Sequence, residues 1–306
     1  MRPKLGRPDI GRYADRFDVS AATGAFGVTF LGVTTLLFDD GDSAVLTDGF
    51  FSRPSLLQVG FRRIAPDHAR ISEALTRIGL ERLEAVVPVH THFDHALDAP
   101  VVAARTGAVL AGGTSVANLG RGYGLAKDRL LTVIPGEPVR FGAFRLTWMV
   151  SAHCPPDRYP GPIPEPVVPP ARAKAYRCGE AWSVLVEHDS DRTALVQGSA
   201  GFVPGALVGR RAEVAYLGVG QLGLQSEDYI RAYWAETVEA VGARRVVLIH
   251  WDDFFRPLDR PLRALPYAGD DLDATMQILS AVAEEQDVAL QFPTVWRRED
   301  PWRSLG

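Results

Sequence analysis

The first apolar stretch of the chain, residues 19–38, alternates loosely between larger and smaller side chains. It has no charged residue, but it holds four threonines and three glycines. A membrane-spanning helix needs about 20 predominantly apolar residues, and scattered threonines and glycines weaken transfer into lipid. The alternation around Val28 and Phe30, followed by the acidic turn 39–42, instead predicts buried strands joined by a hairpin. We therefore expect no stable membrane insertion.

Helical and strand-like segments then alternate along the chain. Ile71, Leu75 and Ile78 share one face of a helix predicted for residues 66–79, which ends at a glycine. Further helices are predicted at 98–107, 226–241 and 272–285, and strands at 83–89, 108–110, 129–134, 144–150, 182–188, 193–198, 214–219 and 245–250. This alternation predicts one layered α/β domain over residues 1–306, with its core at about 26–290.

Residues 155–170 interrupt this pattern, because half of the positions in PPDRYPGPIPEPVVPP are proline. Such a segment forms neither a helix nor a central strand. Its composition is typical of a stiff surface connection. Its position beside His153 favours, equally, a wall over a binding site. We call residues 155–170 the proline-rich segment.

The strand predicted at 83–89 is followed directly by HTHFDH, which places three histidines and an aspartate within six positions. Packing alone gives no reason for so many polar side chains there. His90 and His92 alternate on an extended segment and point the same way, and Asp94 and His95 reach a second position once the chain turns into a helix. Imidazole nitrogens and carboxylate oxygens are ligands of zinc and related metals. The cluster predicts a metal site with room for two ions.

The composition limits the kinds of molecule that the protein is expected to bind. The formal net charge of −4 gives none of the basic field that nucleic-acid binding relies on. Two cysteines, Cys154 and Cys178, are too few for a disulfide framework, and the sequence shows no secretory signal. We expect a cytoplasmic protein that acts on a small molecule, without a nucleic-acid partner. The sequence does not predict the oligomeric state.

The pattern H-x-H-x-D-H at residues 90–95 resembles the signature of the metallo-β-lactamase superfamily. Other positions of that family follow in order, namely Asp48 in AVLTDGF, His153 in VSAHCP, Ser199 in VQGSAGF and His250 in VVLIHWDDF. The resemblance covers about residues 26–255. The stretches VTFLGVTTLLFDDGDSAVLTDGFFSRPS and IHWDDFFRPL look most like the branch of L-ascorbate-6-phosphate lactonase and the N-acylphosphatidylethanolamine-hydrolysing phospholipase D.

The resemblance implies a four-layer αββα sandwich with metal ions at one edge, between two sheets. It assigns the first ion to His90, His92 and His153 and the second ion to Asp94, His95 and His250. Asp94 would also be catalytic, by orienting the nucleophile or transferring a proton, and Asp48 would fix a histidine through its other ring nitrogen. Zinc is the expected metal, as one or two ions, with manganese or iron(II) as alternatives.

The sequence departs from the family pattern at two positions. Ser199 stands where members of this branch commonly have an aspartate that bridges the ions, and a neutral hydroxyl is a weak ligand. Val33 stands where the branch often has a histidine. Asp252 or Asp253 either supplies a compensating carboxylate or serves as a turn residue, and the turn is favoured. Cys154 is not favoured as a ligand, and His68 and His188 match no family position.

These features predict a metal-dependent hydrolase that uses a metal-activated hydroxide on a small organic substrate. A lactone, another ester or a phosphodiester is the favoured substrate class. The alternative is a non-catalytic or altered-site metal-binding relative, since Ser199 replaces the bridging aspartate. Bound transition metal and turnover of such substrates would separate the two hypotheses.

Overall fold

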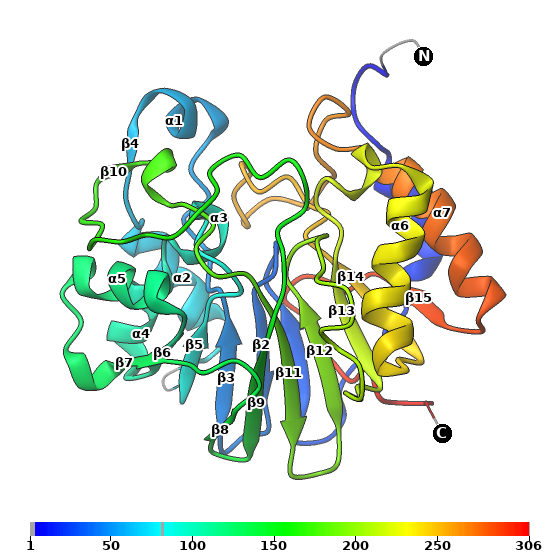
Figure 1. The fold of residues 1–306 in the computed structure, drawn as a ribbon, viewed down its shortest axis with the longest axis horizontal. Coiled ribbons are helices and arrows are strands. Elements are labelled where there is room, and N and C mark those ends of the chain that lie inside the picture. Colours follow the sequence, from blue (N-terminus) through cyan, green and yellow to red (C-terminus); the bar gives the residue numbers. More distant parts are fainter. Residues whose placement is uncertain (1–3, 81–82, 306) are drawn as a thin grey trace.

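The computed structural model describes residues 4–80 and 83–305, so residues 1–3, 81–82 and 306 of the predicted domain lie outside the described part. Its centre is a pair of mixed β-sheets packed face to face (Figure 1). The first sheet has the spatial order β16 (Arg298–Glu299), β1 (Gly27–Phe30), β2 (Leu36–Asp39), β3 (Ala44–Thr47), β5 (Ala85–Val87), β6 (Val109–Gly112) and β7 (Leu130–Thr132). In this sheet β3, β5, β6 and β7 are parallel, and the pairings of β16, β1, β2 and β3 are antiparallel.

The second sheet repeats this mixture of directions. Its spatial order is β15 (Ala289–Gln291), β14 (Arg245–Ile249), β13 (Val214–Gly218), β12 (Thr193–Gln197), β11 (Trp182–His188), β9 (Phe144–Val150) and β8 (Pro138–Phe141). Strands β12 to β15 are parallel, and β11, β9 and β8 are antiparallel neighbours. A small ribbon pairs β4 (Arg63–Ile64) with β10 (Ala171–Arg172).

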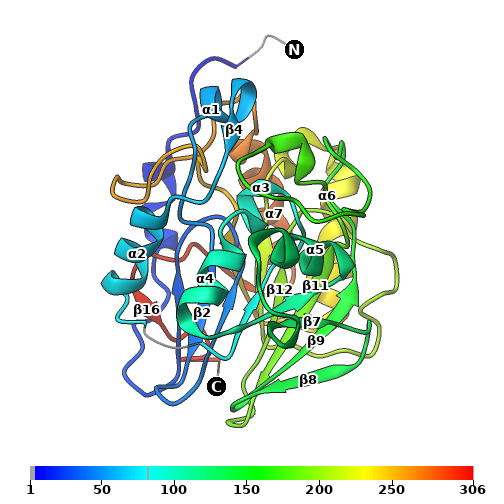
Figure 2. The same cartoon turned by 90° about the vertical axis from the view of Figure 1, so that its left-hand side faces the viewer.

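Helices cover the outer face of each sheet and complete four layers (Figures 1 and 2). The first sheet is covered by α2 (His68–Arg77), α4 (Ala99–Thr106) and α5 (Thr114–Tyr123), and the second by α6 (Glu227–Trp234) and α7 (Leu272–Glu285). The short helices α1 (Leu56–Phe61) and α3 (Phe93–Ala96) lie toward the upper end of the sheets in Figure 1. The predicted αββα sandwich is confirmed.

The main core lies between the two sheets. Trp148 of β9 is fully buried there, and Phe38 of β2 contacts Tyr216 of β13 across the interface, with ring centroids 5.8 Å apart. Fully burying one large apolar side chain contributes about 1.5–3 kcal/mol. Because this packing fixes the two sheets relative to each other, it also fixes the loops at their shared upper edge.

Several elements have the predicted bounds, and others differ for identifiable reasons. Strands β9 and β11 and helix α7 begin and end where the apolar pattern places them. The helix predicted for 226–241 is interrupted, since α6 ends at Trp234 and a π-helical turn covers Ala235–Glu239. Helix α5 was not predicted; it contains Gly122, where a Cβ would collide with the carbonyl oxygen of Val167.

The segment at 19–38 forms β1, a turn and most of β2, as the alternation predicts. Within residues 4–80 and 83–305, no helix combines the length and the apolar character that crossing a membrane requires. The proline-rich segment is described throughout and contains neither helix nor strand. Its Ile163 is buried, and its carbonyl accepts a hydrogen bond from Asn118 of α5, at 2.8 Å.

Candidate metal centre

The loop after β5 carries the histidine cluster and is held from three sides. The backbone N–H of Val89 donates to Oδ1 of Asp48 at 2.9 Å, and the carbonyl of Val89 accepts from Trp182 N, also at 2.9 Å. The N–H of Thr91 donates to the carbonyl of Cys178 at 2.8 Å. His92 then takes the N-cap position of α3, so Asp94 and His95 lie in the first turn of that helix. The local fold therefore directs the side chains of the histidine cluster toward the edge of the first sheet.

The second sheet brings more polar residues to the same edge. Strand β9 runs in the same direction as β12 and β14, because β11 is antiparallel to both of its neighbours. The carboxyl ends of parallel strands meet at one edge of a sheet. His153 follows β9, Ser199 follows β12 and His250 follows β14. This topology brings together residues that are far apart in the sequence.

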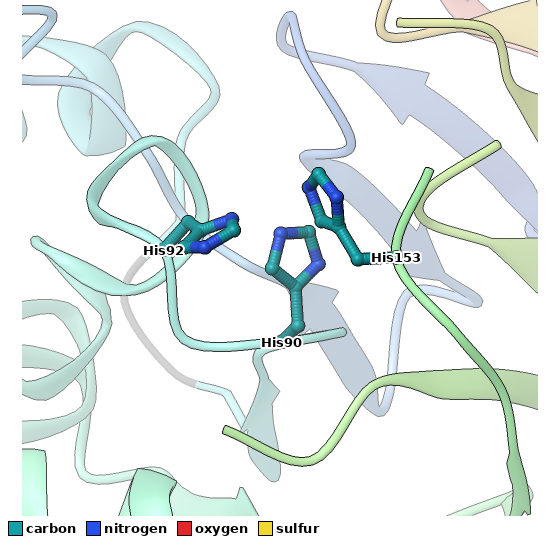
Figure 3. Close-up of side chains that lie close together, drawn as sticks. All are labelled: His90, His92 and His153. Atoms are coloured by element: carbon teal, nitrogen blue, oxygen red, sulfur yellow. The ribbon is translucent and has the colours of Figure 1, made fainter. Parts of the chain in front are cut away.

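His90, His92 and His153 form the first group of donors, and their rings face one another in Figure 3. One nitrogen from each ring lies within 4.8 Å of the other two. Nε2 of His90 is buried and has no hydrogen-bond partner among the described residues, which is unfavourable unless a cation binds there. Nδ1 of His153 lies 2.7 Å from the carbonyl of Cys154, so its N–H donates there and Nε2 keeps its lone pair.

Asp94, His95 and His250 form the second group, also within 4.8 Å of one another. Oδ2 of Asp94 lies 3.7 Å from Nε2 of His95 and 3.6 Å from Nε2 of His250. The rings of His90 and His95 have centroids 3.8 Å apart, so the two groups are adjacent. Both donor sets fit divalent metals in composition and burial.

The pKa values of three imidazoles favour cation binding, whereas at His250 the effect of burial is outweighed by Asp94, which raises the pKa. Burial, reinforced by the neighbouring imidazoles, lowers the pKa of His90 well below its ordinary value, and burial lowers the pKa of His95 to about 3 and that of His153 to about 4. These rings are neutral at pH 7, the form that binds metals. Burial would raise the pKa of Asp94, but His95 and His250 outweigh it and keep the group a carboxylate.

Asp48 contacts His95 from the side away from Asp94. Nδ1 of His95 lies 2.7 Å from Oδ2 of Asp48, and both side chains are fully buried. An N–H donated to this carboxylate leaves Nε2 of His95 free to bind a cation. Asp48 has a φ of +53°, and a left-handed backbone at a residue other than glycine is often found at functional sites.

Asp48→Asn is therefore expected to weaken metal binding at the second group by about 10- to 100-fold, the usual cost of losing such a partner. The asparagine keeps the size of the side chain but offers one acceptor oxygen in place of the two that face Val89 N and Nδ1 of His95. Metal-binding titrations that resolve the two groups would measure the effect. Equal affinity in Asp48→Asn and in the natural protein would contradict this role.

Ser199 lies just after β12, and its side chain forms a hydrogen bond with the backbone. Its hydroxyl accepts a hydrogen bond from the N–H of Cys154 at 2.9 Å. Val33, the other departure, has a φ of +52° and accepts a hydrogen bond from the N–H of His250 at 2.7 Å through its carbonyl. Val33 therefore helps to hold the backbone of His250, which itself has a φ of +57°.

Asp252 has a role that the sequence does not reveal. It is fully buried and forms an ion pair with Arg53, with Oδ2 of Asp252 2.6 Å from Nη2 of Arg53. Its Oδ1 accepts a hydrogen bond from the N–H of Val33 at 2.8 Å. Asp252 is thus neither a turn residue nor a member of a donor group, and it supports the loop that holds His250.

Other sequence candidates belong to neither donor group. His68 is exposed at the start of α2, and His188 pairs with Asp40 at 3.0 Å. Cys154 is buried and belongs to none of the candidate groups found among the described residues. Sequence reasoning missed Asp157, whose Oδ1 lies 3.2 Å from Nε2 of His92.

Comparisons with known proteins agree with this architecture. The family model of the metallo-beta-lactamase superfamily matches residues 28–180, half of the chain. No curated protein matches the sequence. A possible metal-dependent hydrolase from Veillonella parvula superposes with a TM-score of 0.55 at 15% identity, over 89% of this chain and 97% of that chain.

Two further structures show how varied the relatives of this fold are. Isothiocyanate hydrolase from Delia radicum gut bacteria gives a TM-score of 0.53 at 12% identity, over 89% of this chain and 98% of that chain. CmlA, a diiron beta-hydroxylase from Streptomyces venezuelae, gives 0.53 at 11% identity, over 90% of this chain and 54% of that chain. At such identities the likeness shows the fold alone, and the branch within the family stays a prediction. From the family model, the fold and the order of its polar residues, the chain belongs to the metallo-beta-lactamase superfamily.

Proposed function

We propose that the protein is a metal-dependent hydrolase of a small organic substrate, with zinc as the metal. The observation that carries the proposal is the pair of adjacent donor groups at one sheet edge, His90, His92 and His153 beside Asp94, His95 and His250. The first group would hold one ion through three imidazoles. The second would hold another through two imidazoles and a carboxylate.

A bound divalent ion lowers the pKa of a water in its shell to about 7 and polarises a carbonyl or phosphoryl oxygen. The chain supplies the remaining functions. Asp94 is a carboxylate of the second group and would orient an attacking water or transfer its proton. Asp48 holds His95 in the tautomer that leaves Nε2 free. These roles make hydrolysis the reaction that the residues support best.

A lactone or another ester is the favoured substrate, followed by a phosphodiester. Half-buried aromatic side chains flank the second group, since the ring of Phe254 packs edge-on against His250 with centroids 5.8 Å apart, and Phe255 packs against Phe254. Such a flank suits the apolar part of an uncharged acyl substrate. A panel of lactones, aryl esters and phosphodiesters, assayed after loading with zinc, manganese or iron(II), tests the proposal.

The second ion is expected to bind less tightly than the first, because Ser199 offers a neutral hydroxyl where a bridging carboxylate would add negative charge. Ser199→Asp should therefore raise the occupancy of the second group, from below one ion toward one ion per chain. An aspartate can still accept the hydrogen bond from Cys154 N. Metal content after dialysis at a fixed low zinc concentration measures the change, and unchanged content in the variant would contradict the expectation.

A non-catalytic metal-binding relative is the second candidate, and the neutral Ser199 is the observation that favours it. This candidate requires tight metal binding without turnover of any substrate class in the panel. Recovery of turnover in Ser199→Asp alone would show that the natural chain has lost activity through this one position. Turnover in the natural protein would exclude the candidate.

A further inference from the structure

A carboxylate and a thiol lie beside His92. Asp157 of the proline-rich segment has its Oδ1 3.2 Å from Nε2 of His92, and the thiol of Cys178 lies close to the Asp157 side chain. Donor atoms of His92, Asp157 and Cys178 lie within 4.8 Å of one another. His92 and Cys178 are buried, and the Asp157 side chain is 21% exposed.

An imidazole that binds a cation through one nitrogen carries its hydrogen on the other nitrogen, which then needs an acceptor. His95 has Asp48 as this acceptor and His153 has the carbonyl of Cys154, each at 2.7 Å. Nε2 of His92 is buried and makes no hydrogen bond of good geometry within the described part of the chain. The carboxylate of Asp157 is the acceptor beside it.

We propose that Asp157 positions His92 for cation binding through Nδ1 by accepting the N–H of Nε2, and that Cys178 in turn positions Asp157. The inference rests on the proposed metal centre and assigns a role to the proline-rich segment. The segment shapes the ligand geometry of the first ion without contributing a ligand to it.

Backbone hydrogen bonds anchor the segment around Asp157, and Oδ1 of Asp157 also accepts a hydrogen bond from Tyr159 N at 3.0 Å, a bond that Asp157→Asn can keep and Asp157→Ala cannot. The N–H of Cys178 donates to the carbonyl of Tyr159 at 2.8 Å, and that of Gly179 donates to the carbonyl of Gly161 at 3.0 Å. The carbonyl of Cys178 in turn accepts from Thr91 N, in the histidine loop. The proline-rich segment, residues 178–179 and the histidine loop therefore form one connected unit.

The test uses the full chain, stripped of metal and titrated with Co²⁺, whose visible absorption reports ligand geometry. Asp157→Ala should weaken binding at the first group by about 10- to 100-fold and change the absorption spectrum. Asp157→Asn should lose less, because its amide oxygen still accepts a hydrogen bond. Glu165→Ala removes an exposed carboxylate from the same segment and should match the natural protein in both readouts.

Three outcomes would overturn the inference. Natural affinity and spectrum in Asp157→Ala would show that Asp157 does not position His92. Weaker binding with an unchanged spectrum would show that it contributes charge alone. If the natural protein itself binds no Co²⁺, the proposed metal centre fails and this inference fails with it, whereas the first two outcomes leave the centre intact.

Cys178 gives an independent check. Cys178→Ser keeps a donor to Asp157 and should bind Co²⁺ as the natural protein does, whereas Cys178→Ala should fall between the natural protein and Asp157→Ala. A thiolate-to-cobalt charge-transfer band that disappears in Cys178→Ser would show that His92, Asp157 and Cys178 bind the ion directly, which contradicts a positioning role. Thermal unfolding of each metal-free variant shows whether its fold is retained.

Discussion

Replacing His90 with alanine is expected to remove both tight metal binding and turnover. His90 belongs to the first donor group and also lies next to the second, with its ring centroid 5.0 Å from that of His153 and 3.8 Å from that of His95. Its loss leaves the first ion with two protein ligands, so the loss of affinity should exceed the about 10- to 100-fold cost of losing an outer partner. Hydrolysis should fall to background, because the remaining residues offer no substitute for the ion.

His68→Ala is the matched control, since it removes an exposed imidazole at the start of α2. Its metal content and turnover should equal those of the natural protein. Chelation of the natural protein should reproduce the effect of His90→Ala, and readdition of zinc should restore turnover. Full activity of His90→Ala in a metal-free buffer would contradict the assignment.

Arg53→Met is expected to destabilise the fold by about 3–5 kcal/mol, the cost of leaving one buried charge without its partner. Arg53 and Asp252 are both fully buried, and their ion pair lies under the loop in which Asp252 holds Val33 and Val33 holds His250. The free energy of unfolding from denaturant titration of the metal-free protein measures the effect. Metal binding at the second group should weaken in parallel.

Two further variants test whether the loss of stability comes from the isolated buried charge. Asp189→Ala breaks the ion pair between Arg140 and Asp189, whose side chains are 60% and 56% exposed, and should cost no more than about 1 kcal/mol. A double variant, Arg53→Met with Asp252→Leu, should recover part of the lost stability because it leaves no isolated charge. A loss below about 1 kcal/mol in Arg53→Met would show that the buried pair does not support the loop.

Local patterns in the sequence were sufficient to predict the layers of the fold and the part of the site at residues 90–95. Strands such as β9 and β11 follow from short segments rich in apolar and aromatic residues, and the cluster at 90–95 is visible because its residues are neighbours in the chain. His153 and His250 carry no local signal of their own. Their assignment depended on the family order, and the sheet topology then brought them to the edge that carries the cluster.

Contacts between distant residues could not be predicted. Arg53 and Asp252 are 199 positions apart, and nothing in either neighbourhood indicates a buried pair. Asp157 lies in a segment whose many prolines dominate its sequence pattern. Its position four residues after His153 nevertheless indicates that it lies near the site. Helix α5 was missed because its glycines obscure the helical pattern, and Gly122 serves close packing against the proline-rich segment.

Anomalous diffraction from crystals grown with zinc tests the central claim most directly. The account predicts an anomalous peak about 2.0–2.1 Å from one nitrogen of each of His90, His92 and His153, the ordinary zinc–imidazole distance. A second, weaker peak is expected among Asp94, His95 and His250. Saturating zinc without a peak among the first three imidazoles would contradict the account.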